Sequence, residues 1–169
     1  IVYEDDVLLV INKPSEFLSV PGKRIQDSVY QRIKDMYPEA TGPLIVHRLD
    51  MSTSGLLLIA KDEETYVKLQ SQFIKRTIKK RYVALLDGVL KEMEGFIDLP
   101  LRVDLDDRPR QLVCYEHGKQ ARTNWEVIEV KNNQTRVYFY PISGRTHQLR
   151  VHASHDLGLK TPIVGDDLY

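Results

Sequence analysis

The segment from residue 125 to residue 140 constrains the fold more than any other part of the sequence. Apolar and polar residues alternate over residues 125–130 and again over 135–140, as in strands with one buried face. Asn132 and Asn133 lie between the two runs, and asparagine tolerates the positive φ angles of a tight turn. The pattern predicts an antiparallel hairpin, with Trp125, Tyr138 and Phe139 in the core.

Apolar runs and helical periodicities predict the remaining elements. Strands are expected at residues 7–11, 44–46, 55–60 and 81–86. Helices are expected at residues 27–37, with Asp27 or Ser28 as cap, and at residues 63–75. Residues 146–157 alternate like a strand, but Thr146 as a cap and Gly158 as a stop favour a helix. The fold class is therefore predicted to be α+β, with a mixed, largely antiparallel sheet flanked by a few helices.

The size and composition of the chain indicate one globular domain over residues 1–169. The 169 residues are 42% apolar, and no linker or internal repeat is visible. No apolar run is long enough for a membrane span and no secretion signal is present, so a cytoplasmic protein is expected. Cys114 is the only cysteine, which excludes an internal disulfide and fits a reducing compartment.

The charge balance is neutral, with 24 basic and 24 acidic residues, and this weighs against a nucleic-acid partner. However, residues 75–81 contain five positive charges and no acid: Lys75, Arg76, Lys79, Lys80 and Arg81. They form either a basic stripe that binds phosphates or a solvated charged loop.

The first candidate site is the polar segment 47–55, which lies between two apolar runs. Asp50 in this segment is a candidate nucleophile, general base or metal ligand, and a nearby Arg would favour its ionised form. The same residues also suit a turn in which the carboxylate bonds to backbone N–H groups.

A second cluster, residues 144–152, contains Arg145, His147, Arg150 and His152. In a helix, His147 and Arg150 lie on one face, three positions apart. An arginine there would pair with a carboxylate or a phosphate, unless the segment is only a solvated helix face.

Taken together, these motifs resemble the RluA family of pseudouridine synthases. The resemblance covers almost the whole chain and follows the family's order: residues 12–14 with 19–22, 47–58, 80–84, 144–152 and 162–166. Residues 98–119 are similar to the RluA branch itself, whose members modify ribosomal RNA and a tRNA anticodon stem-loop. The resemblance implies the pseudouridine synthase fold and isomerisation of specific uridines in structured RNA.

The resemblance also implies residue roles. Asp50 would be the essential carboxylate, attacking the uracil ring or the ribose C1′, Tyr82 would pack on the target base, and Arg150 would pair with the catalytic aspartate. Arg48 would contact RNA and help to fill the space left by the flipped nucleotide. The basic residues of 75–81, with Arg145 and His147, are expected to bind RNA.

The chemistry requires an anionic group but no metal and no cofactor, and the target nucleotide must leave its stem-loop to reach the site. We expect a monomer without a separate N-terminal RNA-binding domain. Family members normally continue past residue 166 with a final strand, so the catalytic domain is expected to be incomplete at its C-terminus.

Three alternatives stay open at this point. A metal-dependent hydrolase would use His47, Asp50, His147 and His152 as ligands. A non-catalytic RNA-binding module would bind RNA and leave uridine unchanged. Cys114 with His117 would form a nucleophile and base, although the sequence around Cys114 favours strand packing.

Overall fold

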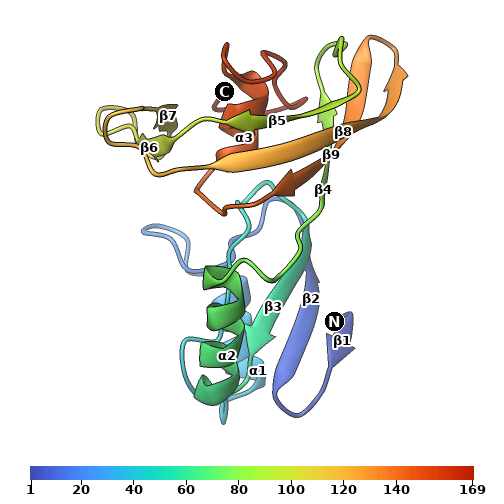
Figure 1. Cartoon of the computed structure of the whole chain (residues 1–169). Coiled ribbons are helices and arrows are strands. Elements are labelled where there is room, and N and C mark those ends of the chain that lie inside the picture. The colour runs from blue at the N-terminus through green and yellow to red at the C-terminus, as the bar shows by residue number, and fades with distance from the viewer. The chain divides into compact units, whose positions relative to one another are not determined.

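The computed structural model describes all residues from 1 to 169, and the chain forms two compact units, Ile1–Ile78 and Lys79–Tyr169 (Figure 1). The junction falls within the basic segment 75–81, so Lys75 and Arg76 belong to the first unit and the other three basic residues to the second. That the two units act as one catalytic domain stays a prediction.

The first unit contains a three-stranded antiparallel sheet in the order β1-β2-β3. Its strands are β1 (Tyr3–Glu4), β2 (Leu8–Lys13) and β3 (Gly55–Ala60). β2 and β3 pair from Leu8 with Ala60 to Lys13 with Gly55. Leu9, Leu57 and Ile59 are fully buried, so one face of this sheet forms the core of the unit.

Two helices belong to the first unit, as the sequence predicts: α1 (Val29–Met36) and α2 (Glu63–Ile74). Ser28 is the cap of α1, because its hydroxyl oxygen accepts a hydrogen bond from the Gln31 backbone N–H. Asp27 instead forms an ion pair with Arg32. Asp62 caps α2 in the same way as Ser28 caps α1, by accepting from the Thr65 N–H.

The strand expected at residues 44–46 was wrong. These residues are buried, but only Ile45 forms a β-bridge, to Ile59, and Leu44 has a positive φ of 62° that interrupts an extended chain. The segment therefore leads into residues 47–54 as irregular backbone packed against β3.

The second unit is built on a four-stranded antiparallel sheet in the order β4-β9-β8-β5. Its strands are β4 (Tyr82–Leu86), β5 (Glu94–Asp98), β8 (Arg122–Lys131) and β9 (Gln134–Pro141). The expected hairpin is confirmed as β8 and β9, and Asn132 and Asn133 both have positive φ angles, 54° and 58°. The turn thus uses the backbone freedom for which asparagine is suited.

A two-stranded sheet and one helix complete the second unit: β6 (Leu101–Val103), β7 (Gln111–Val113) and α3 (Gln148–Ser154). Trp125 and Phe139 lie in the core of the four-stranded sheet with Ala153 of α3. Tyr138 does not, because neighbouring strand residues face opposite sides, and the Arg81 guanidinium lies 4.5 Å from its ring centre.

Helix α3 is shorter than the sequence suggested. His147, not Thr146, is its N-cap residue, with a left-handed backbone (φ 53°) and no side-chain cap bond, and the helix ends at Ser154, before Gly158. His147 therefore lies outside the helix that carries Arg150. None of the three helices is long and apolar enough to cross a membrane.

Candidate active site

The segment around Asp50 is held at both ends by the first unit. It follows buried Val46 and leads into β3 at Gly55. Within it Leu49 is buried, Arg48 is exposed and Asp50 is half-buried. The buried side chains of Val46 and Leu49 therefore anchor the loop on either side of exposed Arg48, and Asp50 follows directly after the second anchor.

Ser19 fixes the backbone directly before Asp50. Its hydroxyl donates to the carbonyl oxygen of Leu49 at 2.8 Å and accepts from the Leu49 N–H at 3.1 Å. Ser19 is 3% exposed, so water does not compete for these two bonds. Four residues before Asp50, the carbonyl oxygen of Val46 accepts a 2.5 Å hydrogen bond from the side-chain amide of Gln70 in α2.

His47 has a structural place in the same loop. Its Nε2 accepts a hydrogen bond from the Leu58 backbone N–H at 3.0 Å, so that nitrogen carries no proton. Its ring stacks on Phe73 of α2 with the ring centres 4.9 Å apart. These contacts tie the loop to β3 and α2, and the Nε2 lone pair is already used.

Lys13 is the most unusual residue of the unit, because a lysine is rarely fully buried. Its ammonium group donates three hydrogen bonds to carbonyl oxygens: to Phe17 at 2.6 Å, Pro14 at 2.9 Å and Met51 at 3.1 Å. Burial lowers the pKa of Lys13, and the charge of Asp50 opposes that shift. Lys13 therefore joins the end of β2 to the residue that follows Asp50.

The remainder of the loop is held by backbone groups. The Met51 carbonyl also accepts from the Phe17 N–H at 3.1 Å, and Ser15 donates to the Ser52 carbonyl at 2.7 Å. The Thr53 N–H closes a turn onto the carbonyl of Asp50. Gly55 then enters β3 with φ of 130°, a backbone conformation that other residues rarely adopt.

Tyr82 and Arg150 belong to the second unit. Tyr82 is the first residue of β4, lies opposite Phe139 of β9, and packs half-buried against the sheet core. Its place at a strand end gives the ring a rigid support.

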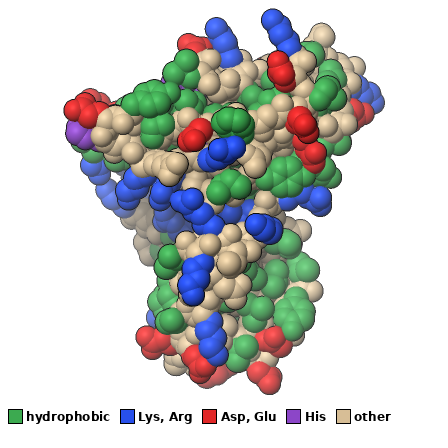
Figure 2. All heavy atoms as spheres, viewed as in Figure 1, with side chains coloured by type: hydrophobic (Ala, Val, Ile, Leu, Met, Phe, Trp, Pro, Cys, Tyr) green, Lys and Arg blue, Asp and Glu red, His purple; other side chains and the backbone are tan.

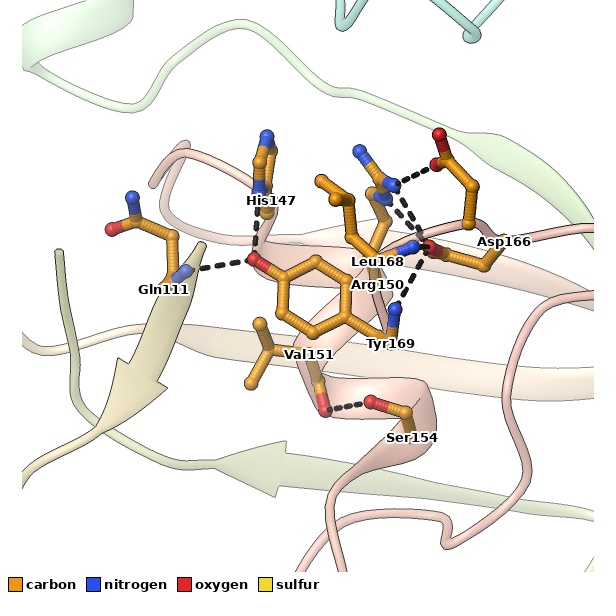
Figure 3. Close-up of polar contacts among 9 residues, drawn as sticks. Gln111, His147, Arg150, Val151, Ser154, Asp166, Leu168 and Tyr169 are labelled. Atoms are coloured by element: carbon orange, nitrogen blue, oxygen red, sulfur yellow. Dashed lines mark hydrogen bonds and ion pairs between the residues drawn. The ribbon is translucent and has the colours of Figure 1, made fainter. Parts of the chain in front are cut away.

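Arg150, on α3, forms a two-pronged ion pair with Asp166 (Figure 3). Its Nε and Nη2 donate to the two carboxylate oxygens, each at 2.8 Å. The sequence motif implied a pairing of Arg150 with Asp50 and gave no role to Asp166. Since Asp50 belongs to the other unit, that pairing stays a prediction.

The start of α3 is fixed by Gln148, which is 4% exposed. Its amide oxygen accepts from the Ser143 hydroxyl and the Arg145 N–H, while its amide nitrogen donates to the Arg122 carbonyl and the Thr123 hydroxyl. All four hydrogen-bonding positions of the amide are thus used. This network sets the position from which Arg150 projects.

Some of the basic residues expected to bind RNA are exposed, whereas others are hydrogen-bonded to carbonyl oxygens of the protein. Lys75, Arg76, Lys79 and Arg81 are exposed. By contrast, Lys80 donates to the carbonyl oxygen of Ser143, and the Nε of Arg145 donates to that of Gln120, each at 3.0 Å. Figure 2 shows Lys and Arg side chains gathered along one edge of the second unit, with acidic side chains scattered over the rest of that face.

His147, also expected to bind RNA, is half-buried, and its Nδ1 is hydrogen-bonded to the Tyr169 hydroxyl at 2.7 Å (Figure 3). Its Nδ1 edge therefore faces the protein.

The metal-site alternative conflicts with the surroundings of His152. This residue is fully buried, and its Nε2 donates to the Leu99 carbonyl at 3.0 Å, because a carbonyl oxygen only accepts. Its Nδ1 then accepts from the Thr123 hydroxyl at 2.9 Å. Both nitrogens are used, and in neither unit is a group of three His, Cys, Asp or Glu side chains arranged to hold a metal ion.

Cys114 and His117 also lack the geometry of a nucleophile and base. The Cys114 sulfur accepts a hydrogen bond from the backbone N–H of His117, at 3.4 Å. The imidazole of His117 lies instead 3.7 Å from the Glu116 carboxylate, at the surface.

Comparison with known proteins gives a consistent result. The model of the RNA pseudouridylate synthase family matches residues 7–155. A dual-specificity RNA pseudouridine synthase, RluA, from Escherichia coli strain K12 is 48% identical over 172 residues, which cover 100% of this chain and 76% of that protein. The same-named protein of Haemophilus ducreyi is 49% identical, with coverage of 99% and 76%.

Solved structures agree with the sequence comparison. Human RNA pseudouridylate synthase domain containing 4 superposes with a TM-score of 0.78 at 28% identity, covering 98% of this chain and 67% of that one. Human RNA pseudouridylate synthase domain containing 1 has a TM-score of 0.79 at 29% identity, covering 98% and 66%.

Proposed function

The chain belongs to the RNA pseudouridylate synthase family, and we propose that it isomerises specific uridines in structured RNA to pseudouridine, with Asp50 as the catalytic carboxylate. The observation that carries this proposal is the anchoring of the Asp50 loop. Lys13, Ser19 and Gln70 bond to the backbone on both sides of Asp50, so the carboxylate is presented from a preorganised loop.

The reaction suits a single anionic group. The bond between N1 of uracil and C1′ of ribose breaks, the base turns, and a bond from C5 to C1′ forms. The hydrogen on C5 leaves as a proton and N1 gains one, so atoms and electrons balance without a redox partner. Asp50 would act as a nucleophile toward the uracil ring or the ribose C1′.

Three further residues complete the proposed site. Arg150 would pair with Asp50 and hold its carboxylate in place through charge-assisted hydrogen bonds. The ring of Tyr82, supported by the sheet core, would stack on the base of the extruded nucleotide. Arg48 is exposed on the Asp50 loop and would fill the place that this nucleotide leaves.

We propose ribosomal RNA and a tRNA anticodon stem-loop as the two substrate classes, acted on in the cytoplasm by a monomer. The resemblance of residues 98–119 to the RluA branch supports this choice, and the relatives from E. coli and H. ducreyi are named dual-specificity enzymes. The exposed basic residues of 75–81 would hold the phosphates of such RNAs.

The test is pseudouridine mapping of total RNA from a strain that lacks this gene, complemented with the full-length wild type or with Asp50→Asn. We expect one or more sites in ribosomal RNA and tRNA to disappear with the gene and to return only with the wild type. An unchanged map would overturn the proposal.

A binding measurement separates catalysis from RNA binding alone. Asp50→Asn is expected to bind the substrate stem-loop as the wild type does, while it releases no tritium from RNA labelled at uracil C5. If the wild type also binds without releasing tritium, the chain is a non-catalytic RNA-binding module.

A further inference from the structure

We propose that Asp166 is a positioning residue of this enzyme, which orients the guanidinium group of Arg150 for catalysis. The inference rests on the proposed function, in which Arg150 acts beside the catalytic carboxylate. It assigns a role to a residue of the segment 163–169, which follows α3 in the chain.

The ion pair fixes a plane rather than only a distance. Nε and Nη2 of Arg150 donate to Oδ2 and Oδ1 of Asp166, both at 2.8 Å. A guanidinium group bound along one edge cannot rotate about its long axis, so the direction of its remaining nitrogen, Nη1, is set. The Arg150 side chain is 13% exposed and that of Asp166 is 3% exposed, so water screens this pair little.

The carboxylate of Asp166 is itself held in place. Its Oδ1 also accepts from the backbone N–H groups of Leu168, at 2.9 Å, and Tyr169, at 3.2 Å. Burial raises the pKa of the Asp166 carboxyl, but the hydrogen bonds and the charge of Arg150 outweigh it and leave the pKa below its usual value. The group is therefore ionised at neutral pH and does not swing away from Arg150.

Tyr169 fastens this turn to two other elements of the unit (Figure 3). Its hydroxyl accepts from the Gln111 N–H, at the start of β7, and is hydrogen-bonded to Nδ1 of His147, at the start of α3. The Arg150 guanidinium lies 5.3 Å from the centre of the Tyr169 ring. The Arg150 guanidinium is thus bonded along one edge by Asp166 and lies over the ring of Tyr169.

The neighbouring Asp167 provides a matched control. It also contacts Nη2 of Arg150, at 3.1 Å, but through one oxygen, and its side chain is 80% exposed. An exposed, single contact of this kind adds little order to the guanidinium. Two adjacent aspartates therefore touch the same arginine, and only one of them defines its plane.

The experiment compares Asp166→Asn with Asp167→Asn in the full-length protein. Asn at 166 keeps an oxygen for the Leu168 and Tyr169 N–H groups, whereas its amide NH₂ faces the Arg150 Nε–H, so the two-pronged ion pair is broken while the turn is retained. Three quantities are measured: the single-turnover rate of tritium release, the Kd for the same RNA, and the melting temperature.

We expect Asp166→Asn to lower the single-turnover rate by about 10- to 100-fold, with Kd and melting temperature close to wild type. Asp167→Asn is expected to change the rate by less than about 2-fold. In an Arg150→Lys background, Asp166→Asn should reduce the rate little further, because the group that it orients is already gone.

The inference is overturned if Asp166→Asn and the wild type have equal single-turnover rates, or if the variant only binds RNA more weakly. In both cases the wild type is still active, so the proposed function is unaffected. If Asp166→Asn does not fold, the variants Asp166→Glu and Tyr169→Phe are used to test the positioning role instead. Folded forms of both with slower single turnover and unchanged Kd support the positioning role, and wild-type rates in both refute it. A wild type without synthase activity would instead remove the proposed function itself.

Discussion

The ammonium nitrogen of Lys13 donates a hydrogen bond to the carbonyl oxygen of Met51, at 3.1 Å and across 38 positions of the sequence. Met51 is the residue after Asp50, so a buried charge at the end of β2 sets the position of the candidate catalytic carboxylate. Because the same nitrogen also bonds to Pro14 and Phe17, all three of its protons are used.

Replacing Lys13 by Met should therefore impair both stability and activity. The variant removes the donor of three part-buried hydrogen bonds to carbonyl oxygens, and we expect the free energy of unfolding to fall by about 1 to 3 kcal/mol. The single-turnover rate should also fall, because the Asp50 loop is no longer bonded to β2. Urea unfolding and tritium release measure the two effects. Lys23→Met, at an exposed position, is the control, and an equal effect there would contradict the role of Lys13.

Ser19 offers a second test of the same loop. Ser19→Ala removes both hydrogen bonds to Leu49 in a buried place, and we expect a loss of about 1 to 2 kcal/mol together with slower turnover. Ser15→Ala removes one exposed bond to Ser52 and should cost less in both measurements. If the two variants are equally stable and equally active, the hydrogen bonds of Ser19 do not hold the Asp50 loop in place.

The stability of the protein should decrease in mild acid because of His152. Burial lowers the pKa of its imidazole in the folded state. The unfolded chain binds a proton there below about pH 6.5, where the folded chain does not, so falling pH favours unfolding until the lower folded pKa is reached. Each pH unit in this range costs at most about 1.4 kcal/mol.

Two measurements check this expectation. Imidazole NMR signals of His152 should titrate below the ordinary histidine range near pH 6.5, and urea unfolding should show a lower free energy at pH 5.5 than at pH 7.5. A His152 signal that titrates near pH 6.5 would contradict the argument.

Salt dependence should reveal the role of the exposed basic residues. Lys75→Gln/Arg76→Gln is expected to weaken RNA binding and to lower the slope of log Kd against log salt concentration by about 0.7 to 0.9 for each phosphate that is no longer neutralised. Lys68→Gln removes a charge that is already paired with Glu64 on α2 and should alter the slope less. An unchanged slope in the double variant would mean that these two side chains do not touch phosphates.

The sequence predicted those helices and strands whose own residues show a clear periodicity, cap or turn. The hairpin of β8 and β9 was clear because Asn132 and Asn133 suit positive φ and the flanking residues alternate. Helices α1 and α2 were clear from apolar spacing and from caps such as Ser28. Strands β5, β6 and β7 were not expected, because they are short or, in β5, contain Gly95, and they depend on pairing partners elsewhere in the chain.

For the candidate site, the motifs pointed to Asp50, Tyr82 and Arg150 but not to the residues that hold them. Lys13 and Gln148 lie within the quoted motifs, yet a lysine and a glutamine are normally read as exposed. Their burial depends on carbonyl oxygens and hydroxyls that only the folded chain brings close. The same holds for Asp166, whose contact with Arg150 spans 16 positions.

The Asp50 loop is fastened through its main chain, and this has a consequence for how such enzymes diverge. The anchored carbonyl oxygens of Val46, Leu49, Met51 and Ser52 exist whatever side chains these residues carry. Met51 and Ser52 are exposed, so they are open to substitution while the loop keeps its shape. The side chains at these two positions are therefore free to change, by evolution or by engineering, separately from the geometry of the candidate catalytic carboxylate.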